Sequence, residues 1–321
     1  PISLAPEVVH ISDRRQEPLN ATPALVIETD VEGVVTTSWV TPDGQVLREE
    51  SAMGWTLMAE PHDQAIAIPK GEGPELDLLS TVAVPIDRPI EHPETLQQLT
   101  LLVEGASAEA IEIARPAQVI LPPEALSRYR VPPPSGPWCV MQIQRVTPLP
   151  DAGETPDDIR RYAQASPLIQ SDDPRILSQA RQIVGDRLEP WPQAVALHQW
   201  VSATLTKRLT VGLPSALDVL ESRSGDCHEH TILFTALARS LGIPTRAVAG
   251  LVHYRGQLYY HAWPEVWIGR WVPTDPTLGQ EIADVTHLGL VEAENELLLT
   301  LAKFVGQLRV RVLDTVEVAD D

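Results

Sequence analysis

The segment between Asp226 and Pro244 constrains the fold more than any other part of the chain, because it specifies a buried helix and marks both of its ends. Asp226 follows a glycine and can accept hydrogen bonds from the first N–H groups of a helix. The apolar residues that follow recur three and four positions apart and predict one buried face: Ile232, Leu233, Ala236, Leu237 and Leu241. Gly242 and Pro244 then end the helix, a glycine followed by a proline.

The first turn of this helix contains Cys227, one of two cysteines in the 321 residues. A thiolate in that position faces the positive end of the helix dipole and N–H groups without helical partners, and both stabilise it. The same N–H groups could stabilise an oxyanion formed at an attacked carbonyl. Residue types alone leave three interpretations open: a nucleophile, a buried small residue or a metal ligand.

A thiol nucleophile needs a base, and the base needs a group that orients it. Both types of residue follow the helix. His261 lies in an alternating segment that places Trp263 and Glu265 on its own side, and Asp275 follows the next strand. A cysteine on a helix, followed by a hairpin that carries histidine and aspartate, is a workable arrangement for a catalytic triad.

The register of that hairpin provides a test. If Gly269 and Arg270 alone formed the loop, Pro264 would oppose Asp275, and the aspartate would lie on the face opposite to His261. A three-residue loop or a bulge places Trp263 opposite Asp275 and returns the aspartate to the face of His261. We predict this odd register.

The residues around Cys227 also allow a zinc site, because thiolate and imidazole groups bind zinc. However, His228 and His230 are two positions apart and point to different sides of a helix. We therefore predict neither a metal nor an organic cofactor. The expected cleft lining is Asp226, His228, Glu229, His230 and Trp263. The histidines without partners in sequence are assigned to the surface or to packing: His10, His62, His92, His198 and His287.

The negative net charge of the chain argues against anionic partners. The chain has 24 Lys and Arg against 44 Asp and Glu, a net charge of −20, which argues against nucleic acid or an anionic membrane surface as the main partner. No apolar run reaches the roughly 18–20 residues of a membrane span. Because the chain begins with Pro1 rather than methionine, we expect an export signal or anchor to have been removed; without one, the protein would be cytoplasmic.

Three regions are predicted along the chain. Residues 1–120 have the short strands and turns of an all-β, sandwich-like accessory domain. Residues 121–165 begin with a proline-rich run and are expected to form a linker and connecting segment, with Cys139 buried on a short strand. Residues 166–321 change to helical patterns and are expected to form a catalytic domain that ends in a helix and a strand.

Four motifs in this last region together resemble the transglutaminase-like superfamily, a papain-related group. They are Gly-Asp-Cys opening a helix, Gly-Ile-Pro-Thr-Arg ending it, His-Ala-Trp on a strand, and Asp-Pro-Thr after the next strand. The resemblance spans about residues 171–284. It implies an α+β fold in which the cysteine helix packs on an antiparallel sheet. It also implies roles for Cys227 as nucleophile, His261 as base and Asp275 as the group that orients the base.

The resemblance implies a cysteine-dependent enzyme that transfers acyl groups from amide or peptide bonds. A protease or amidase would use water as the acceptor and a transglutaminase an amine; the triad is common to both, and we favour hydrolysis. The expected substrate is a peptide, a protein or a cell-envelope amide. A catalytically silent peptide-binding module of the same fold is the alternative, and a zinc-binding hydrolase is a lesser one. Arg246 is expected to anchor an ion pair.

Overall fold

The computed structural model divides the chain into two compact units, which are described separately. The first is Pro1–Ala83 with Ala302–Gln307, and the second is Val84–Leu301 with Leu308–Asp321. The structure describes residues 10–19, 22–31, 34–51, 56–60, 83–111, 113, 117–148, 155–208, 214–292, 301 and 303–318.

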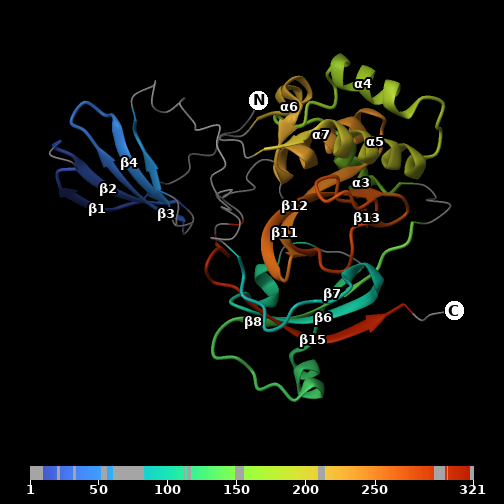
Figure 1. Cartoon of the computed structure of the whole chain (residues 1–321), viewed down its shortest axis with the longest axis horizontal. Helices are drawn as coiled ribbons and strands as arrows, with labels where there is room; N and C mark the ends of the chain where they lie inside the picture. Colours follow the sequence, from blue (N-terminus) through green and yellow to red (C-terminus); the bar gives the residue numbers. More distant parts are fainter. Residues whose placement is uncertain are drawn as a thin grey trace. The chain divides into compact units, whose positions relative to one another are not determined.

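The first unit contains one antiparallel sheet whose strands follow each other in chain order (Figure 1, blue). The strands are β1 (His10–Gln16), β2 (Leu25–Val31), β3 (Val34–Val40), β4 (Val46–Ser51) and β5 (Thr56–Met58). Its buried apolar cluster consists of Ala24, Val26 and Trp39. The region is all-β, as the sequence predicts, and among its described residues the strands form this single sheet.

The second unit begins earlier than the sequence suggests. Its first sheet has the order β15-β6-β8-β7, with β6 (Leu96–Glu104), β7 (Gln118–Leu121), β8 (Trp138–Gln144) and β15 (Arg309–Glu317). The predicted boundary at residue 120 therefore falls inside β7, a strand that pairs with β8 in this sheet. The proline-rich run is a connection within this sheet, partly wound into the 3₁₀ helix η3 (Pro123–Tyr129), and not a linker between domains. Local composition could not show that β7 and β8 pair across it.

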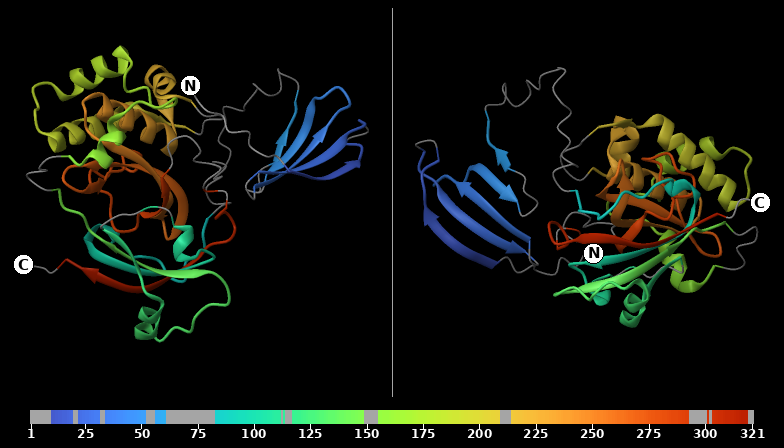
Figure 2. Two further views of the ribbon diagram at one scale, coloured as in Figure 1. Left: turned by 180° about the vertical axis from the view of Figure 1, so that it is seen from behind. Right: turned by 60° about the horizontal axis from the view of Figure 1, so that its bottom comes forward.

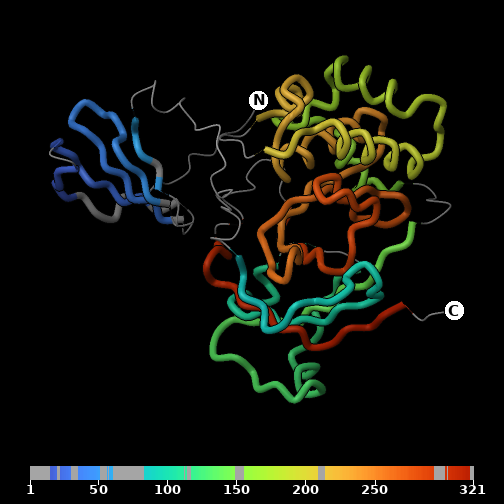
Figure 3. The backbone as a smooth tube through the Cα atoms, viewed as in Figure 1, coloured from blue at the N-terminus to red at the C-terminus, as the bar shows by residue number. Residues whose placement is uncertain are grey.

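The last strand returns to the start of this unit. Figure 3 shows the C-terminal segment beside the teal segment of β6, and both views of Figure 2 agree. β15 pairs antiparallel with β6 at the sheet edge, so the predicted C-terminal strand is confirmed. The predicted helix before it falls largely on residues 293–300 and 302, which lie outside the described residues. Among the described residues, no helix has the length and hydropathy to cross a membrane.

The helices of the second unit pack around one central helix. They are α3 (Asp157–Arg160), α4 (Pro174–Val184), α5 (Pro190–Thr204), α6 (Ala216–Ser222) and α7 (Cys227–Ser240). α7 contacts α4, α5 and α6 as well as the sheet below it (Figure 1). Its apolar face joins theirs in a core that includes Ile176, Leu197, Leu233 and Leu237. Capping matches the sequence signals, with Asp173 accepting from the backbone N–H of Arg175 at the start of α4.

The second sheet of this unit has the order β13-β12-β11-β14 and is antiparallel throughout. Its strands are β11 (Thr245–Tyr254), β12 (Gln257–Trp267), β13 (Trp271–Pro273) and β14 (Leu288–Glu292). α7 packs against β12 and β11, so the expected α+β fold, with the cysteine helix on an antiparallel sheet, is confirmed. Helix and sheet together bring Cys227 to the strand that carries His261.

Candidate active site

Cys227 is the first residue of α7 and is partly exposed. Asp226 caps the helix, and its side chain accepts from the backbone N–H of His228 at 2.9 Å. In return, the Glu229 carboxylate accepts from the N–H of Asp226 at 2.8 Å. Gly225 is required for this closed arrangement, because a Cβ there would lie 2.2 Å from Cβ of Glu229. The sequence Gly-Asp-Cys thus holds the thiol at a helix N-terminus through local geometry.

The hairpin of β12 and β13 has the predicted odd register. Glu265 pairs with Pro273 and Trp267 pairs with Trp271, which leaves three residues, 268–270, in the loop. Continuing this pairing places Asp275 opposite Trp263, on the side of the sheet that also carries His261. One residue fewer in the loop would have turned the aspartate to the other face.

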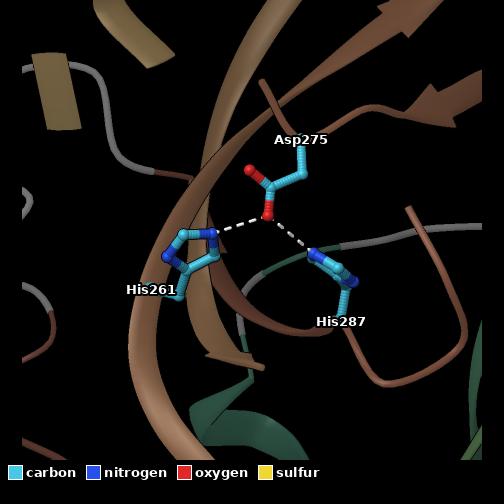
Figure 4. A group of neighbouring side chains, drawn as sticks. All are labelled: His261, Asp275 and His287. Carbon is cyan, nitrogen blue, oxygen red and sulfur yellow. Dashed lines mark hydrogen bonds and ion pairs between the residues drawn. The ribbon is translucent and has the colours of Figure 1, made fainter. Parts of the chain in front are cut away.

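His261 and Asp275 meet as this register requires. Nε2 of His261 donates to Oδ2 of Asp275 at 2.7 Å, and both side chains are buried (Figure 4). Burial by itself would lower the pKa of His261, but the Asp275 carboxylate and a hydrogen bond with Cys227 raise it to about 9. Because Nε2 is bound to Asp275, the other ring nitrogen, Nδ1, is left for the thiol of Cys227. The structure therefore brings the three predicted residues together.

Asp275 has donors at both carboxylate oxygens. Oδ1 accepts from the backbone N–H groups of Thr277 at 2.8 Å and Leu278 at 2.9 Å. Oδ2 accepts from His261 and, at 3.0 Å, from Nε2 of His287. Burial would raise the pKa of this carboxyl, but the two histidines hold it well below its usual range. Asp275 is thus an ionised buried group with every partner in place.

His287 belongs to this cluster and corrects the sequence analysis, which assigned it to surface or packing. It immediately precedes β14, its side chain is fully buried, and Nδ1 lies 3.2 Å from the backbone oxygen of Asp284. The only signal in sequence was the spacing of three residues between Asp284 and His287. The contact with Asp275 depends on how β14 pairs with β11, which local patterns do not reveal.

The predicted cleft lining is mostly buried in the structure. Glu229, His230 and Trp263 are at most 2% exposed, and His228 is 8% exposed. Trp263 stacks on the His261 ring with 6.1 Å between centroids, so it supports the ring from within the core. Asp226 is partly exposed; burial and its hydrogen bond with Glu229 raise the pKa of its carboxyl to about 7.

One group of described residues has ligand atoms close enough to hold a metal ion. These are His261, Asp275 and His287, with ligand atoms within 4.8 Å of one another. The two imidazoles already donate to the carboxylate, and a metal would have to replace those protons. Since the pKa of both rings is raised to about 9, this cluster favours protons over a metal.

Arg246 supports the sheet below the site through the ion pair expected of it. Its guanidinium binds the fully buried carboxylate of Glu265 at 2.8 Å and the partly exposed carboxylate of Glu292 at 2.8 Å. It also lies 4.2 Å from the ring of Trp271. Arg246 thus ties β11 to β12, β13 and β14, the strands that carry or flank His261, Asp275 and His287.

Comparisons with known proteins match part of the chain. Residues 178–276 match the transglutaminase-like superfamily. An uncharacterised protein of Mycobacterium leprae is 33% identical over 115 residues, which cover 32% of this chain and 41% of that protein. The match thus spans less than half of that relative's length.

Two solved structures are similar to larger parts of the chain. One is a proposed cysteine protease from Cytophaga hutchinsonii, with 16% identity and a TM-score of 0.45, covering 70% of this chain and 89% of that one. The other is the periplasmic domain of TgpA from Pseudomonas aeruginosa, with 16% identity and a TM-score of 0.39, covering 59% of this chain and 84% of that one.

Proposed function

Since this chain carries a transglutaminase-like domain, we propose that it is a cysteine enzyme that transfers acyl groups from amide or peptide bonds. The observation that carries the proposal is the 2.7 Å bond between His261 and Asp275, formed beside a partly exposed cysteine at a helix N-terminus. In the proposed triad, Cys227 is the nucleophile, His261 is the base and Asp275 orients the base.

The first half of the reaction acylates the cysteine. Nδ1 of His261 takes the thiol proton, and the sulfur of Cys227 attacks the carbonyl carbon of the amide, forming a C–S bond. The tetrahedral intermediate collapses with cleavage of the C–N bond, and protonated His261 gives its proton to the leaving amine. Asp275 stays ionised and holds the ring in the orientation that serves both transfers.

The second half releases the acyl group from the thioester. His261 takes a proton from the acceptor, the acceptor attacks the carbonyl, and the C–S bond breaks with return of the proton to sulfur. Water as acceptor yields a carboxylic acid, and an amine yields a new amide. We favour hydrolysis because water is always available to the thioester, whereas no amine-binding group is required by the triad itself.

The capping of α7 limits which backbone N–H groups can donate a hydrogen bond to the oxyanion. The Asp226 side chain accepts from the backbone N–H groups of His228 and Glu229. These donors are therefore occupied, and we propose the N–H of Cys227 as the first-turn donor to the oxyanion. A tryptophan that animal transglutaminases use for this purpose has no counterpart in sequence near Val211 and Gly212, and these positions lie outside the described residues.

Selective alkylation tests the nucleophile, and Cys139 serves as an internal control. Cys139 is buried on β8, and burial, with a smaller effect of Glu109, raises its pKa to about 12. Intact-mass analysis with a limiting amount of iodoacetamide should show one adduct, mapped to Cys227 by peptide digestion. His261→Ala should slow this reaction markedly. Equally slow alkylation of both cysteines would contradict the proposal and favour the silent peptide-binding alternative.

The acceptor and the substrate class require a second measurement. Peptides, proteins and cell-envelope amides are incubated with wild type and Cys227→Ala, with and without an added primary amine. Release of acid without incorporation of the amine would support hydrolysis, and incorporation would support transamidation. Turnover that survives in Cys227→Ala and is lost with a chelator would favour the zinc alternative instead.

A further inference from the structure

Asp275 places one carboxylate oxygen between two imidazole rings. Figure 4 shows His261 and His287 pointing a nitrogen at the same oxygen from different sides, at 2.7 and 3.0 Å. All three side chains are buried. The proposed mechanism uses one of these rings, so the second calls for a physical explanation.

Both ring nitrogens of His287 face acceptors. Nε2 faces Oδ2 of Asp275, while Nδ1 faces the backbone oxygen of Asp284 at 3.2 Å and its Oδ1 at 3.4 Å. A backbone carbonyl and an ionised carboxylate cannot donate, so a neutral ring would direct a lone pair at an oxygen. The contacts are satisfied only when both nitrogens carry protons. Burial would lower the pKa of His287, but the two aspartates raise it to about 9.

The charges around the ring favour this cation. The Asp284 carboxylate accepts from the backbone N–H of Thr286 at 2.9 Å and from the Thr286 hydroxyl. Burial would raise the pKa of Asp284, but His287 and these contacts lower it. The ring of His287 also has two aromatic neighbours, His261 at 6.1 Å between centroids and Trp263, edge-on, at 5.0 Å.

Two further histidines, His198 on α5 and His230 on α7, interact electrostatically with Asp275. Burial lowers the pKa of both, so at neutral pH they add no positive charge near Asp275.

The backbone is built to hold His287 against Asp275. A Cβ on Gly250 would lie 1.9 Å from the backbone oxygen of Leu288, so only glycine lets β14 approach β11 here. Gly250 is also the residue that pairs with His261 across the sheet. The buried Gln118 side chain bonds both the N–H and the oxygen of Gly289, at 2.9 and 2.7 Å. These contacts fix the chain one and two residues after His287.

We propose that His287 is a positioning residue, a buried imidazolium that shares the Asp275 carboxylate with His261 and limits how strongly that carboxylate holds the His261 proton. The inference rests on the proposed function, in which His261 must both take a proton from sulfur and return one to the leaving amine. If the buried carboxylate of Asp275 accepted from His261 alone, the pKa of His261 would be so high that the ring could not readily give its proton to the leaving amine. Because Oδ2 accepts from both His261 and His287, its interaction with each ring is weaker, while the carboxylate stays in place.

The first test reads the charge of His287 and requires no activity. ¹⁵N spectra of the histidine-labelled full chain, with the His287 signals assigned from their loss in His287→Gln, should show both ring nitrogens protonated at neutral pH. Asp284→Asn keeps the ring but removes a charged acceptor, and should lower the midpoint of its titration by about one pH unit. A neutral His287 ring in the wild type would overturn the proposal, whatever the activity of the variants.

The second test reads the effect on His261. Iodoacetate is attracted by the protonated His261 ring, so alkylation of Cys227 should slow as that ring loses its proton. In His287→Gln, this basic midpoint should move upward by about one pH unit, because a cation and a competitor for Oδ2 are both removed.

His198→Gln is the matched control for that experiment. It changes another buried histidine near Asp275, bonded at 2.8 Å to the Thr274 hydroxyl, but removes no charge, so the midpoint should stay. An unchanged midpoint in His287→Gln, or an equal shift in both variants, would overturn the proposal. Equally slow alkylation of Cys227 and Cys139 in the wild type would instead contradict the proposed function, and the ¹⁵N spectrum would still decide the charge of His287.

Discussion

Among single residues, Asp275 joins the candidate base, His261, to the second histidine, His287. It is fully buried, and its two oxygens accept four hydrogen bonds, two from histidine rings and two from backbone N–H groups. Removing its charge should therefore affect the histidines more than the backbone turn, because an amide oxygen can still accept from N–H groups.

Asp275→Asn should lower the pKa of His261 and slow both Cys227 alkylation and turnover, the latter by about 100-fold or more. The measurements are the pH profile of alkylation and initial rates on any substrate found by screening. Asp218→Asn, at an exposed helix cap, is the control and should change neither. Turnover within a few-fold of wild type would show that Asp275 does not orient the base.

Stability should depend on pH through the two charged histidines. The pKa of His261 and that of His287 are raised from 6.5 to about 9, so the folded state keeps protons that the unfolded chain loses between these values. Their contribution is complete below pH 6.5 and is lost as pH rises through about 9. Each ring lowers the free energy of unfolding by about 1.4 kcal/mol per pH unit within this window.

Urea unfolding followed by tryptophan fluorescence measures this slope between pH 6.5 and 9. Histidines whose pKa is lowered by burial, such as His198, are neutral in the folded state throughout this window, and in the unfolded chain they lose their protons at its lower end, so they contribute little to the slope. His287→Gln should remove about half of the slope. A free energy of unfolding that does not change across the window would contradict the charge assigned to both rings.

The residues of the candidate site show which contacts can be predicted from the sequence and which cannot. Cys227, His261 and Asp275 were predicted from residue type, order and register, because a hairpin relates its strands through a loop that can be counted. His287 was missed because its partner is reached through pairing of β14 with β11, and the intervening chain has no regular spacing that predicts the contact.

At the scale of elements, the close approach of β11 and β14 sets the position of His287. Their register shifts between Ala249 and Gly250, where the Leu288 backbone occupies the space that a side chain on residue 250 would need. Pairing at this point therefore depends on a glycine.

Gly250→Ala should lower the free energy of unfolding by about 2 kcal/mol or more. The new Cβ would clash with the Leu288 backbone, which cannot move aside as the end of a flexible side chain could. It should also move the basic midpoint of Cys227 alkylation. Gly256→Ala is the matched control in the turn that follows the same strand, where a Cβ meets nothing within 4 Å and only the φ of +84° is unfavourable. That change should cost about 1 kcal/mol and leave the alkylation profile unchanged. Equal effects of the two substitutions would contradict the role given to the close approach.

At the scale of the whole molecule, every residue of the candidate site lies in the second compact unit. That unit starts at Val84 and includes β6, which lies inside its sheet between β15 and β8. A cut placed by composition at residue 120 would remove β6, the strand that pairs with β15 along its length.

A fragment of residues 84–321 should therefore fold and alkylate Cys227 at the rate of the full chain. A fragment of residues 121–321 should be unfolded or aggregated, because β8 and β15 lose the strand between them. Circular dichroism, thermal melting and the alkylation rate compare the two. Equal stability of both fragments would contradict the division of the chain described above.

Three features follow from neighbours along the chain and could be predicted: the capped apolar helix that begins at Cys227, the hairpin register that places His261 beside Asp275, and the C-terminal edge strand. Helix caps, hydrophobic period and loop length act over a few residues, so they can be counted from the sequence. Three other features became visible only in the folded chain: which strands share a sheet, where the first unit ends, and the contact of a second histidine with Asp275. Those outcomes depend on pairing between distant segments, such as β6 with β15 and β11 with β14, whose energies are set by mutual packing and by one glycine that permits close approach.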